Sequence, residues 1–384
     1  MSVEGILLRR ERLHLGWSQE GLCKGICAVS YLSKIEQGRA AASEEIVRQL
    51  FARIGITWQG APQTLAPLRA QVEAAYDALF SFRMEEFQGS VKALEPQEAL
   101  LRYSPFALDA MLLLTALSQQ PHEALPQELE ACMDARQLAL QRALQNRFSK
   151  AIALYPRAYF YYLAGDAASE HGRDYPAALE LFQTGFELAA KEGSAHLMLF
   201  CRALAGNCYC NMLDVPNMLA QYEVAQRLAK ALGDEEILET IRYNTAAVRL
   251  ETGEYAEAYA YYAGCAQPSV MTLHKLAICC EKLGRREEAL AALDRAEQME
   301  SFSPDTSTAR RLCALVRMRL ENPEYLHDPA YGEALLAVFA ECRERLPIGY
   351  ASFHLPWVLE WYTAARQYKQ AYELLRTFPK TLIV

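Results

Sequence analysis

Apolar residues recur at intervals of three and four along almost the whole chain, which is the pattern of amphipathic α-helices. Between Val3 and Leu15 this pattern predicts a helix of about three turns that ends at Gly16. Ser43 can cap a further helix that runs to Ile54. No stretch of comparable length alternates apolar and polar residues as a strand does. The sequence therefore predicts an all-α protein.

The stretch between these two helices, Ser18 to Gly38, predicts two short helices joined by a tight turn. Ser18 can cap the first of them with its hydroxyl. A loop at Gly38 and Arg39 then leads to the helix that Ser43 caps, and the whole forms a small helical domain over residues 1–58. Four apolar residues would hold the two short helices together: Leu22, Ile26, Leu32 and Ile35.

Glycine, proline and polar residues at 59–65 predict a linker, and residues 66–384 predict one helix after another. A short motif recurs in this second part. Gly253 to Ala258 and Gly284 to Ala289 share a G-x-x-x-x-A spacing, Gly172 to Ala178 is a variant one residue longer, and weaker copies start at 213, 323 and 366. The starts are 41, 40, 31, 39 and 43 residues apart, which is the period of a solenoid of stacked repeats.

The segment before these copies, residues 65–160, predicts one or two further helical pairs. They are expected around Tyr76 to Leu94 and Leu101 to Ala143, although the repeat motif cannot be aligned there. Each pair leaves one hydrophobic face uncovered, so stacking against its neighbours is what makes it stable.

Composition adds a difference between the two parts. A hydrophobic fraction of 52% with 22% charged residues is globular, and 384 residues suffice for two or three domains. The formal charge of −8 argues against a protein that coats nucleic acid with its whole surface. Residues 1–58 nevertheless carry 8 Lys and Arg against 6 Asp and Glu, whereas the remainder carries 31 against 41. Residues 1–58, called the head below, are therefore weakly basic and the rest of the chain is acidic. This difference suits a small DNA-contacting module attached to a larger domain.

The eleven cysteines are an odd number and include the close neighbours Cys208 and Cys210 and the adjacent Cys279 and Cys280. Neither pair has the C-x-x-C spacing of zinc or thioredoxin sites, so we expect reduced thiols in a cytoplasm and no metal. The chain contains none of the common catalytic or nucleotide-binding motifs, so we expect neither an enzyme nor a cofactor. No signal peptide is evident, and the longest apolar run, Met111 to Leu117, is too short to span a membrane. A cytoplasmic protein is expected.

The order and spacing of residues in the head resemble the helix-turn-helix of XRE/Cro-type repressors. The run from Ile26 through Ser30 and Ser33 to Gly38 resembles most closely the peptide-pheromone-responsive RRNPP regulators, which include Rgg and PlcR. The resemblance implies that Arg12 pairs with Glu36 and so ties the first helix to the DNA-reading helix.

The same resemblance implies two sets of DNA contacts. Phosphate contacts are expected from Gln19, Lys34 and Arg39, with Arg9 as a further candidate. The face that enters the major groove would consist of Ala28, Val29, Ser30, Tyr31 and Ser33. This face is poor in the Arg, Asn and Gln side chains that make paired base contacts, so we expect selectivity to depend on dimerisation. The alternative is a helix-turn-helix that contacts protein.

The repeats resemble tetratricopeptide repeats, most of them longer than the standard ~34 residues, as in RRNPP regulators. The resemblance implies a right-handed α-solenoid whose concave groove is lined by the first helix of each pair. Asparagines there could hold a peptide backbone, and an arginine could take its C-terminal carboxylate. For any single residue the alternative is an ordinary exposed or packing position. The residues expected to bind peptide are Tyr162, Phe200, Asn207, Asn211, Tyr243, Asn244, His274, Arg310 and Arg317.

Taken together, the resemblance implies a dimeric transcription regulator that binds double-stranded operator DNA through its head. A short signalling peptide, as in quorum sensing, would control it from the groove. The alternative from another class is a protein-interaction adaptor whose repeats hold a partner protein. The aromatic stretch from Trp357 to Tyr362 predicts a packed cap or a dimer contact.

Overall fold

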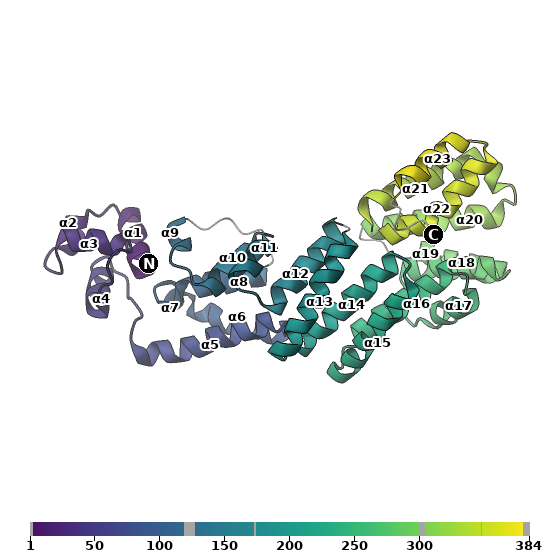
Figure 1. Ribbon diagram of the computed structural model, residues 1–384. Coiled ribbons are helices and arrows are strands. Elements are labelled where there is room, and N and C mark those ends of the chain that lie inside the picture. Colours follow the sequence, from purple (N-terminus) through teal and green to yellow (C-terminus); the bar gives the residue numbers. More distant parts are fainter. Residues whose placement is uncertain (1–2, 119–126, 173, 300–303, 347, 379–384) are drawn as a thin grey trace. The chain divides into compact units, whose positions relative to one another are not determined.

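The computed structural model describes residues 3–118, 127–172, 174–299, 304–346 and 348–378. Within these ranges the ordered elements are all helices, as the sequence predicts, and Figure 1 shows their order. None of the described helices is both long and apolar enough to cross a membrane. The chain forms two compact units, one of Met1–Gly165 with Leu181–Met198 and one of Asp166–Glu180 with Leu199–Val384.

The head, residues 1–58, has its helices where the hydrophobic pattern predicts them. Ser18 Oγ accepts a hydrogen bond from the amide of Gly21 at 3.0 Å, and Ser43 Oγ accepts one from the amide of Ile46 at 3.4 Å. Both serines therefore cap the helices that follow them. The four helices of the head are α1 (Val3–His14), α2 (Gln19–Cys23), α3 (Val29–Glu36) and α4 (Glu44–Arg53).

A close backbone approach joins α1 to α3 inside the head. A Cβ atom on Gly5 would lie 2.1 Å from the carbonyl oxygen of Ile35, so only glycine fits where the two helices cross. The core around this crossing contains the predicted residues: Ile26 is partly buried, and the fully buried ones are Leu22, Leu32 and Ile35.

The segment that connects the head to the repeats is shorter than the predicted linker at 59–65. Pro62 begins α5, because proline is favoured in the first turn of a helix, where its missing N–H is not needed. Only residues 59–61 of the predicted linker lie outside a helix.

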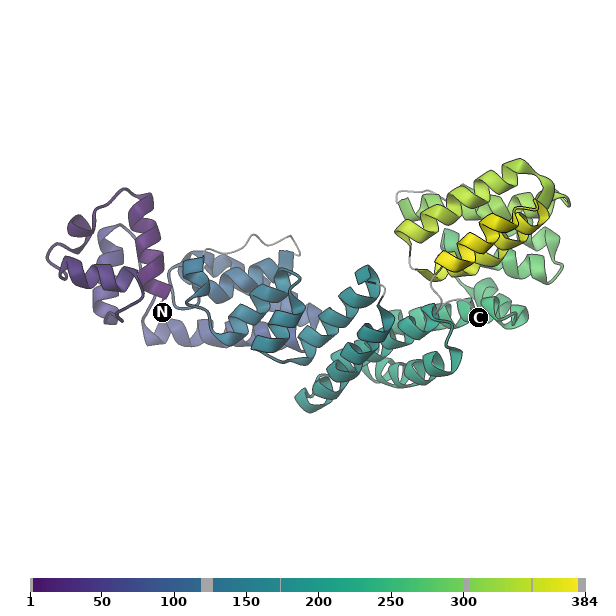
Figure 2. The ribbon, with the colours of Figure 1, turned by 45° about the horizontal axis from the view of Figure 1, so that its top comes forward.

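Most of the remaining helices pack against their neighbours along the chain, as Figure 1 and Figure 2 show. In the first unit they are α5 (Pro62–Phe80), α6 (Met84–Leu94), α7 (Glu98–Arg102), α8 (Ala107–Ser118), α9 (Gln127–Glu130), α10 (Ala135–Leu144), α11 (Phe148–Leu154) and α12 (Ala158–Ala167). The two units divide α13 (Tyr175–Glu192) and α14 (Ala195–Asn211) between them. The second unit continues with α15 (Val215–Leu232), α16 (Glu235–Glu251), α17 (Tyr255–Gly264), α18 (Val270–Lys282), α19 (Arg286–Gln298), α20 (Pro304–Glu321), α21 (Pro329–Arg345), α22 (Ile348–Ala364) and α23 (Tyr368–Thr377).

Eight turns between consecutive repeat helices in the described residues share one geometry. One residue adopts a positive φ, and the amide of the next residue donates to the carbonyl five residues earlier, as Glu254 does to Arg249 at 2.8 Å. Four of the predicted repeat starts coincide with such a turn. The positive-φ residues are Phe82, Asn146, Gly193, Leu213, Gly233, Gly253, Gly284 and Arg366.

These turns also explain where the sequence prediction was incomplete. Phe82 joins α5 to α6, the pair expected around Tyr76 to Leu94, and Asn146 joins α10 to α11. Neither residue is glycine, so the glycine that marks the two matching copies at Gly253 and Gly284 is absent from the sequence there. The second expected pair, Leu101 to Ala143, is wrong in its boundaries, because α10 pairs with α11 beyond it.

Two predicted repeat starts do not form this turn. At 323 the chain takes a longer path through a 3₁₀ turn, Tyr325–His327, before α21 begins. At 172 the end of α12 continues into a π-helical turn, Ala168–Gly172, and Arg173 lies outside the described residues.

Candidate functional site

The predicted DNA-reading face lies on and around α3, and most of it is open to solvent. Ala28 occupies the N-cap position of α3, where its side chain offers no acceptor to the first helical amides. Tyr31 and Ser33 are half-buried. The Tyr31 hydroxyl donates a hydrogen bond to the carbonyl of Ala41 at 3.1 Å. The exposed members of the face are Ala28, Val29 and Ser30, and the predicted phosphate contacts Lys34 and Arg39 are exposed as well.

Arg12 and Glu36 form a two-bond ion pair that joins α1 to α3. Arg12 Nε lies 2.6 Å from Glu36 Oε1, and Arg12 Nη2 lies 2.8 Å from Glu36 Oε2. Both side chains are buried, and Arg12 also donates to the carbonyl of Trp17 at 2.8 Å, just before α2. The hydrogen bond to Glu36 raises the pKa of Arg12 and so favours the charged form. The ion pair therefore connects α1, α3 and the segment that precedes α2.

Gln19 is drawn into the same network. Its Nε2 donates to Glu36 Oε2 at 2.8 Å, which uses one of the two side-chain amide hydrogens of Gln19 inside the head. Only the second of these hydrogens remains for a hydrogen bond to a DNA phosphate. Arg9, the further phosphate candidate, instead lies 2.8 Å from Glu128 in a partly exposed ion pair.

The second unit contains two hollows that share Asn211 and gather five of the nine predicted peptide-binding residues. The larger has a volume of about 770 Å³, and its lining includes Asp166, Tyr175, Asn207, Asn211, Arg343 and Leu346. The smaller has a volume of about 80 Å³, and its lining includes Asn211, Tyr243, Asn244, His274, Lys275 and Tyr350.

Asn207 and Asn244 belong to a hydrogen-bond network across three consecutive helices. Asn207 Oδ1 accepts from the buried hydroxyl of Tyr222 at 2.7 Å and from Asn244 Nδ2 at 3.0 Å. Asn244 Nδ2 also lies 3.1 Å from the Tyr222 hydroxyl. These contacts bind α14, α15 and α16 together. Asn211 differs, because its Nδ2 donates only within its own helix, to the carbonyl of Asn207 at 3.0 Å.

The first turn of α22 closes the smaller hollow. A Cβ on Gly349 would lie 2.8 Å from Asn211 Oδ1, so glycine lets α22 approach α14 there. The Lys275 ammonium group lies 4.9 Å from the Tyr243 ring centroid and 5.9 Å from that of Tyr350. A cation held between two aromatic faces is stabilised by their negative faces. The sequence prediction missed Lys275 and Tyr350, although Lys275 directly follows the predicted His274.

Burial sets the charge of the titratable groups around the smaller hollow. The rings of His274 and His354 stack with centroids 5.6 Å apart. Burial lowers the pKa of His354 to about 4 and that of His274 well below its ordinary value, so both rings are neutral at pH 7. Burial also raises the pKa of Glu251 to about 7, against the opposing charge of Lys275.

The other predicted peptide-binding residues do not line these hollows. Tyr162 lies in the first unit, where its ring centroid is 4.8 Å from that of Phe82. Phe200 and Arg310 are partly buried on their helices but line neither hollow.

Arg317 does not line either hollow, and its role as the site for a peptide carboxylate is not supported. It pairs with Asp294 at 2.6 Å, Glu297 at 3.0 Å and Glu321 at 3.4 Å, so three carboxylates already surround its guanidinium group. Arg343 and Arg345 line the larger hollow, and the sequence prediction missed them.

A metal site has no support in the described part of the chain. No group of three or more His, Cys, Asp and Glu side chains is placed there to hold a metal ion.

Comparison with known proteins gives three matches. The helix-turn-helix family model HTH_3 matches residues 8–60. The transcriptional activator NprA of Geobacillus stearothermophilus is 22% identical over 282 residues, which cover 63% of this chain and 66% of NprA. The chain thus spans just under two thirds of the length of this relative.

A solved structure shares the fold. The apo form of the quorum sensor NprR from B. thuringiensis matches 81% of this chain and 97% of its own, with a TM-score of 0.51 at 15% identity. The resemblance to RRNPP-type regulators is therefore confirmed in two features, a helix-turn-helix matched by HTH_3 at residues 8–60 and an all-α repeat fold like that of NprR.

Proposed function

We propose that this protein is a cytoplasmic, dimeric transcription regulator that binds operator DNA through α3 and is controlled by a short peptide bound to its repeats. The observation that carries the proposal is the combination of an open DNA-reading helix with a hollow of about 770 Å³ in the repeats. That volume is within the range of ordinary ligand sites. The names of NprA and NprR, a transcriptional activator and a quorum sensor, agree with it.

The lining of the larger hollow suggests how a ligand would act. Asn207 and Asn211 come from α14, whereas Arg343 and Leu346 lie at and just beyond the end of α21, far along the sequence. A peptide that contacts both segments would favour the arrangement of repeats that brings them together. Control would then be a shift in population between arrangements, limited by how much more tightly the peptide binds one of them.

The lining also distinguishes the proposal from the alternative, an adaptor that holds a partner protein. Asparagine amides supply both donors and acceptors for the backbone of an extended peptide, and the hollow is concave rather than flat. We therefore favour a short peptide as ligand.

The DNA-binding half of the proposal predicts a specific salt dependence. Replacing Lys34 or Arg39 with alanine removes one exposed cation from the DNA-reading side, and each change should lower the slope of log K against log salt by about 1. Fluorescence anisotropy with fragments of the gene's own upstream DNA measures the slope. Arg48→Ala is the control, because Arg48 already pairs with Glu45 on the exposed side of α4. Binding that is absent, or that does not weaken with salt, would refute DNA recognition by the head.

A further inference from the structure

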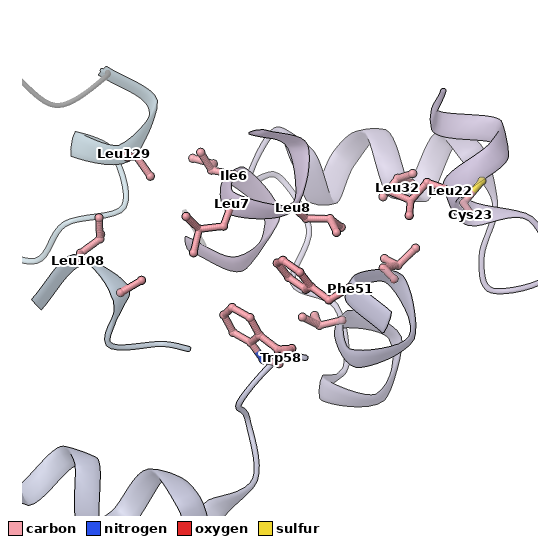
Figure 3. Close-up of a cluster of buried hydrophobic side chains, with 13 residues drawn as sticks. Ile6, Leu7, Leu8, Leu22, Cys23, Leu32, Phe51, Trp58, Leu108 and Leu129 are labelled. Atoms are coloured by element: carbon pink, nitrogen blue, oxygen red, sulfur yellow. The ribbon is translucent and has the colours of Figure 1, made fainter. Parts of the chain in front are cut away.

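The face of α1 that points away from α3 is covered by the first repeats. Figure 3 shows Ile6 and Leu7 of α1 beside Leu129 of α9 and Leu108 of α8, in one cluster of buried hydrophobic side chains. Leu129 is fully buried although it lies on a helix of four residues. This contact surface between the head and residues 98–118 and 127–133 is called the seam below.

Polar contacts surround the apolar part of the seam. Arg9 Nη1 lies 2.8 Å from Glu128 Oε1. On the same helix, Glu11 accepts a hydrogen bond from the Tyr103 hydroxyl at 3.0 Å and lies 3.6 Å from Arg102 Nη2. Two residues of α1 that lie within one turn are thereby fixed to two separate segments of the repeats, which restricts rotation of the head as well as its separation.

The connecting segment is part of the seam too. The amide of Gln59 donates a hydrogen bond to the carbonyl of Tyr103 at 2.8 Å. The segment that connects the head to α5 is therefore itself bonded to the repeats. The ring of Tyr103 lies 6.1 Å from that of Phe51, and Phe51 stacks on Trp58 at 5.0 Å. The core of the head and the seam are therefore continuous.

The seam leaves the DNA-reading face free. Its contacts come from α1, α4 and residues 58–59, whereas the exposed predicted DNA-contacting residues lie between Ala28 and Arg39. A head held in this way can still bind DNA through its exposed residues. The seam therefore fixes the orientation of the head without covering the predicted DNA contacts.

We propose that the seam persists in solution and joins the head and residues 98–118 and 127–133 into one rigid body, so that the repeats set the orientation of α3. Residues 59–61 are then a fixed connection and not a flexible tether. Arg9 serves this contact and not a DNA phosphate. The relevance to regulation rests on the proposed function, whereas the rigid connection itself does not.

Hydrogen exchange followed by mass spectrometry on the full-length protein tests the seam without DNA or peptide. In the wild-type protein the amide of Gln59 should exchange slowly, because it is bonded to Tyr103. Leu129→Asp places a charge in the apolar part of the seam and should speed exchange across residues 56–61 by about tenfold or more. Leu219→Asp, the same change at an exposed position on α15, should leave this segment unchanged.

A charge exchange provides a second variant that keeps the local fold. Arg9→Glu places like charges together and should speed exchange of the same segment, by about threefold to tenfold, and adding Glu128→Arg should restore slow exchange. Wild-type Gln59 exchanging as fast as an unstructured amide would overturn the proposal, as would unchanged exchange in Leu129→Asp. Failure of the double variant to restore protection would overturn the role assigned to Arg9. None of these results depends on whether the protein binds DNA.

Discussion

Replacing Arg12 with leucine should destabilise the head by about 3–5 kcal/mol, the cost of leaving a buried charge without its partner. Glu36 would keep only the hydrogen bond from Gln19, in a site where its side chain is 2% exposed. The carbonyl of Trp17 would lose its donor as well. Thermal or urea unfolding, with the transition of the head followed by hydrogen exchange of α1 to α4, measures the loss. DNA binding should disappear with the fold of the head.

Two matched variants identify the cause of that loss. Arg10→Leu removes a cation from an exposed position on the same helix, so the free energy of unfolding should change by less than about 0.5 kcal/mol. Replacing Arg12 and Glu36 together by leucine removes both charges, and much of the lost stability should return. If the single and double replacements are equally damaging, packing rather than the ion pair holds α1 to α3.

Replacing Asn207 with alanine should weaken both the second unit and its affinity for peptide. The buried Tyr222 hydroxyl would lose its acceptor, which should cost about 1–3 kcal/mol in the free energy of unfolding. Asn211→Ala, in contrast, breaks only a bond within α14, so we expect little loss of stability. Asn211 lines both hollows, so we expect the peptide affinity of this variant to fall about threefold to tenfold.

Thermal shift with short-peptide fractions from the producing culture separates the two effects, since a ligand that binds only the folded state raises the melting temperature. The Asn211 variant should melt like the wild-type protein without peptide and show a smaller shift with it. A full shift in this variant would mean that the peptide binds elsewhere.

The head could be predicted from the sequence because its determinants are local. Ser18 and Ser43 cap helices that begin at the next residue, and the buried core residues recur at helical spacing. Arg12 and Glu36 are 24 positions apart and meet as the family pattern implies. The repeat copies with the clearest spacing were those in which Gly253 and Gly284 supply the positive φ of the turn. The turns at Phe82 and Asn146, which adopt that conformation without glycine, were missed.

The linings of the two hollows could be predicted only in part, because they depend on contacts between distant segments. Fixed positions on each first helix identified Asn207, Asn211 and Tyr243, which lie on neighbouring helices of regular pairs. They failed for Arg317, which pairs with carboxylates of its own and the preceding helix. Gly349 and Tyr350 come from α22, and no spacing in the sequence indicates that this helix packs against α14.

The seam was missed for a related reason. Glycine and proline at 60–62 are typical of a flexible connection, but Pro62 begins a helix and Gln59 bonds to Tyr103. The apolar residues on both faces of α1 were the available signal. Ile6, Leu7 and Leu8 are consecutive and all buried, which one face of a helix cannot achieve.

The central claim is that a peptide in the repeats controls DNA binding by the head. Its most direct test is the affinity of the full-length protein for its own upstream DNA, measured at fixed salt with and without a peptide fraction that raises its melting temperature. The account predicts that the peptide changes the DNA affinity of the wild-type protein and changes it less in the Asn211→Ala variant. A peptide that raises the melting temperature but leaves the DNA affinity unchanged would contradict it.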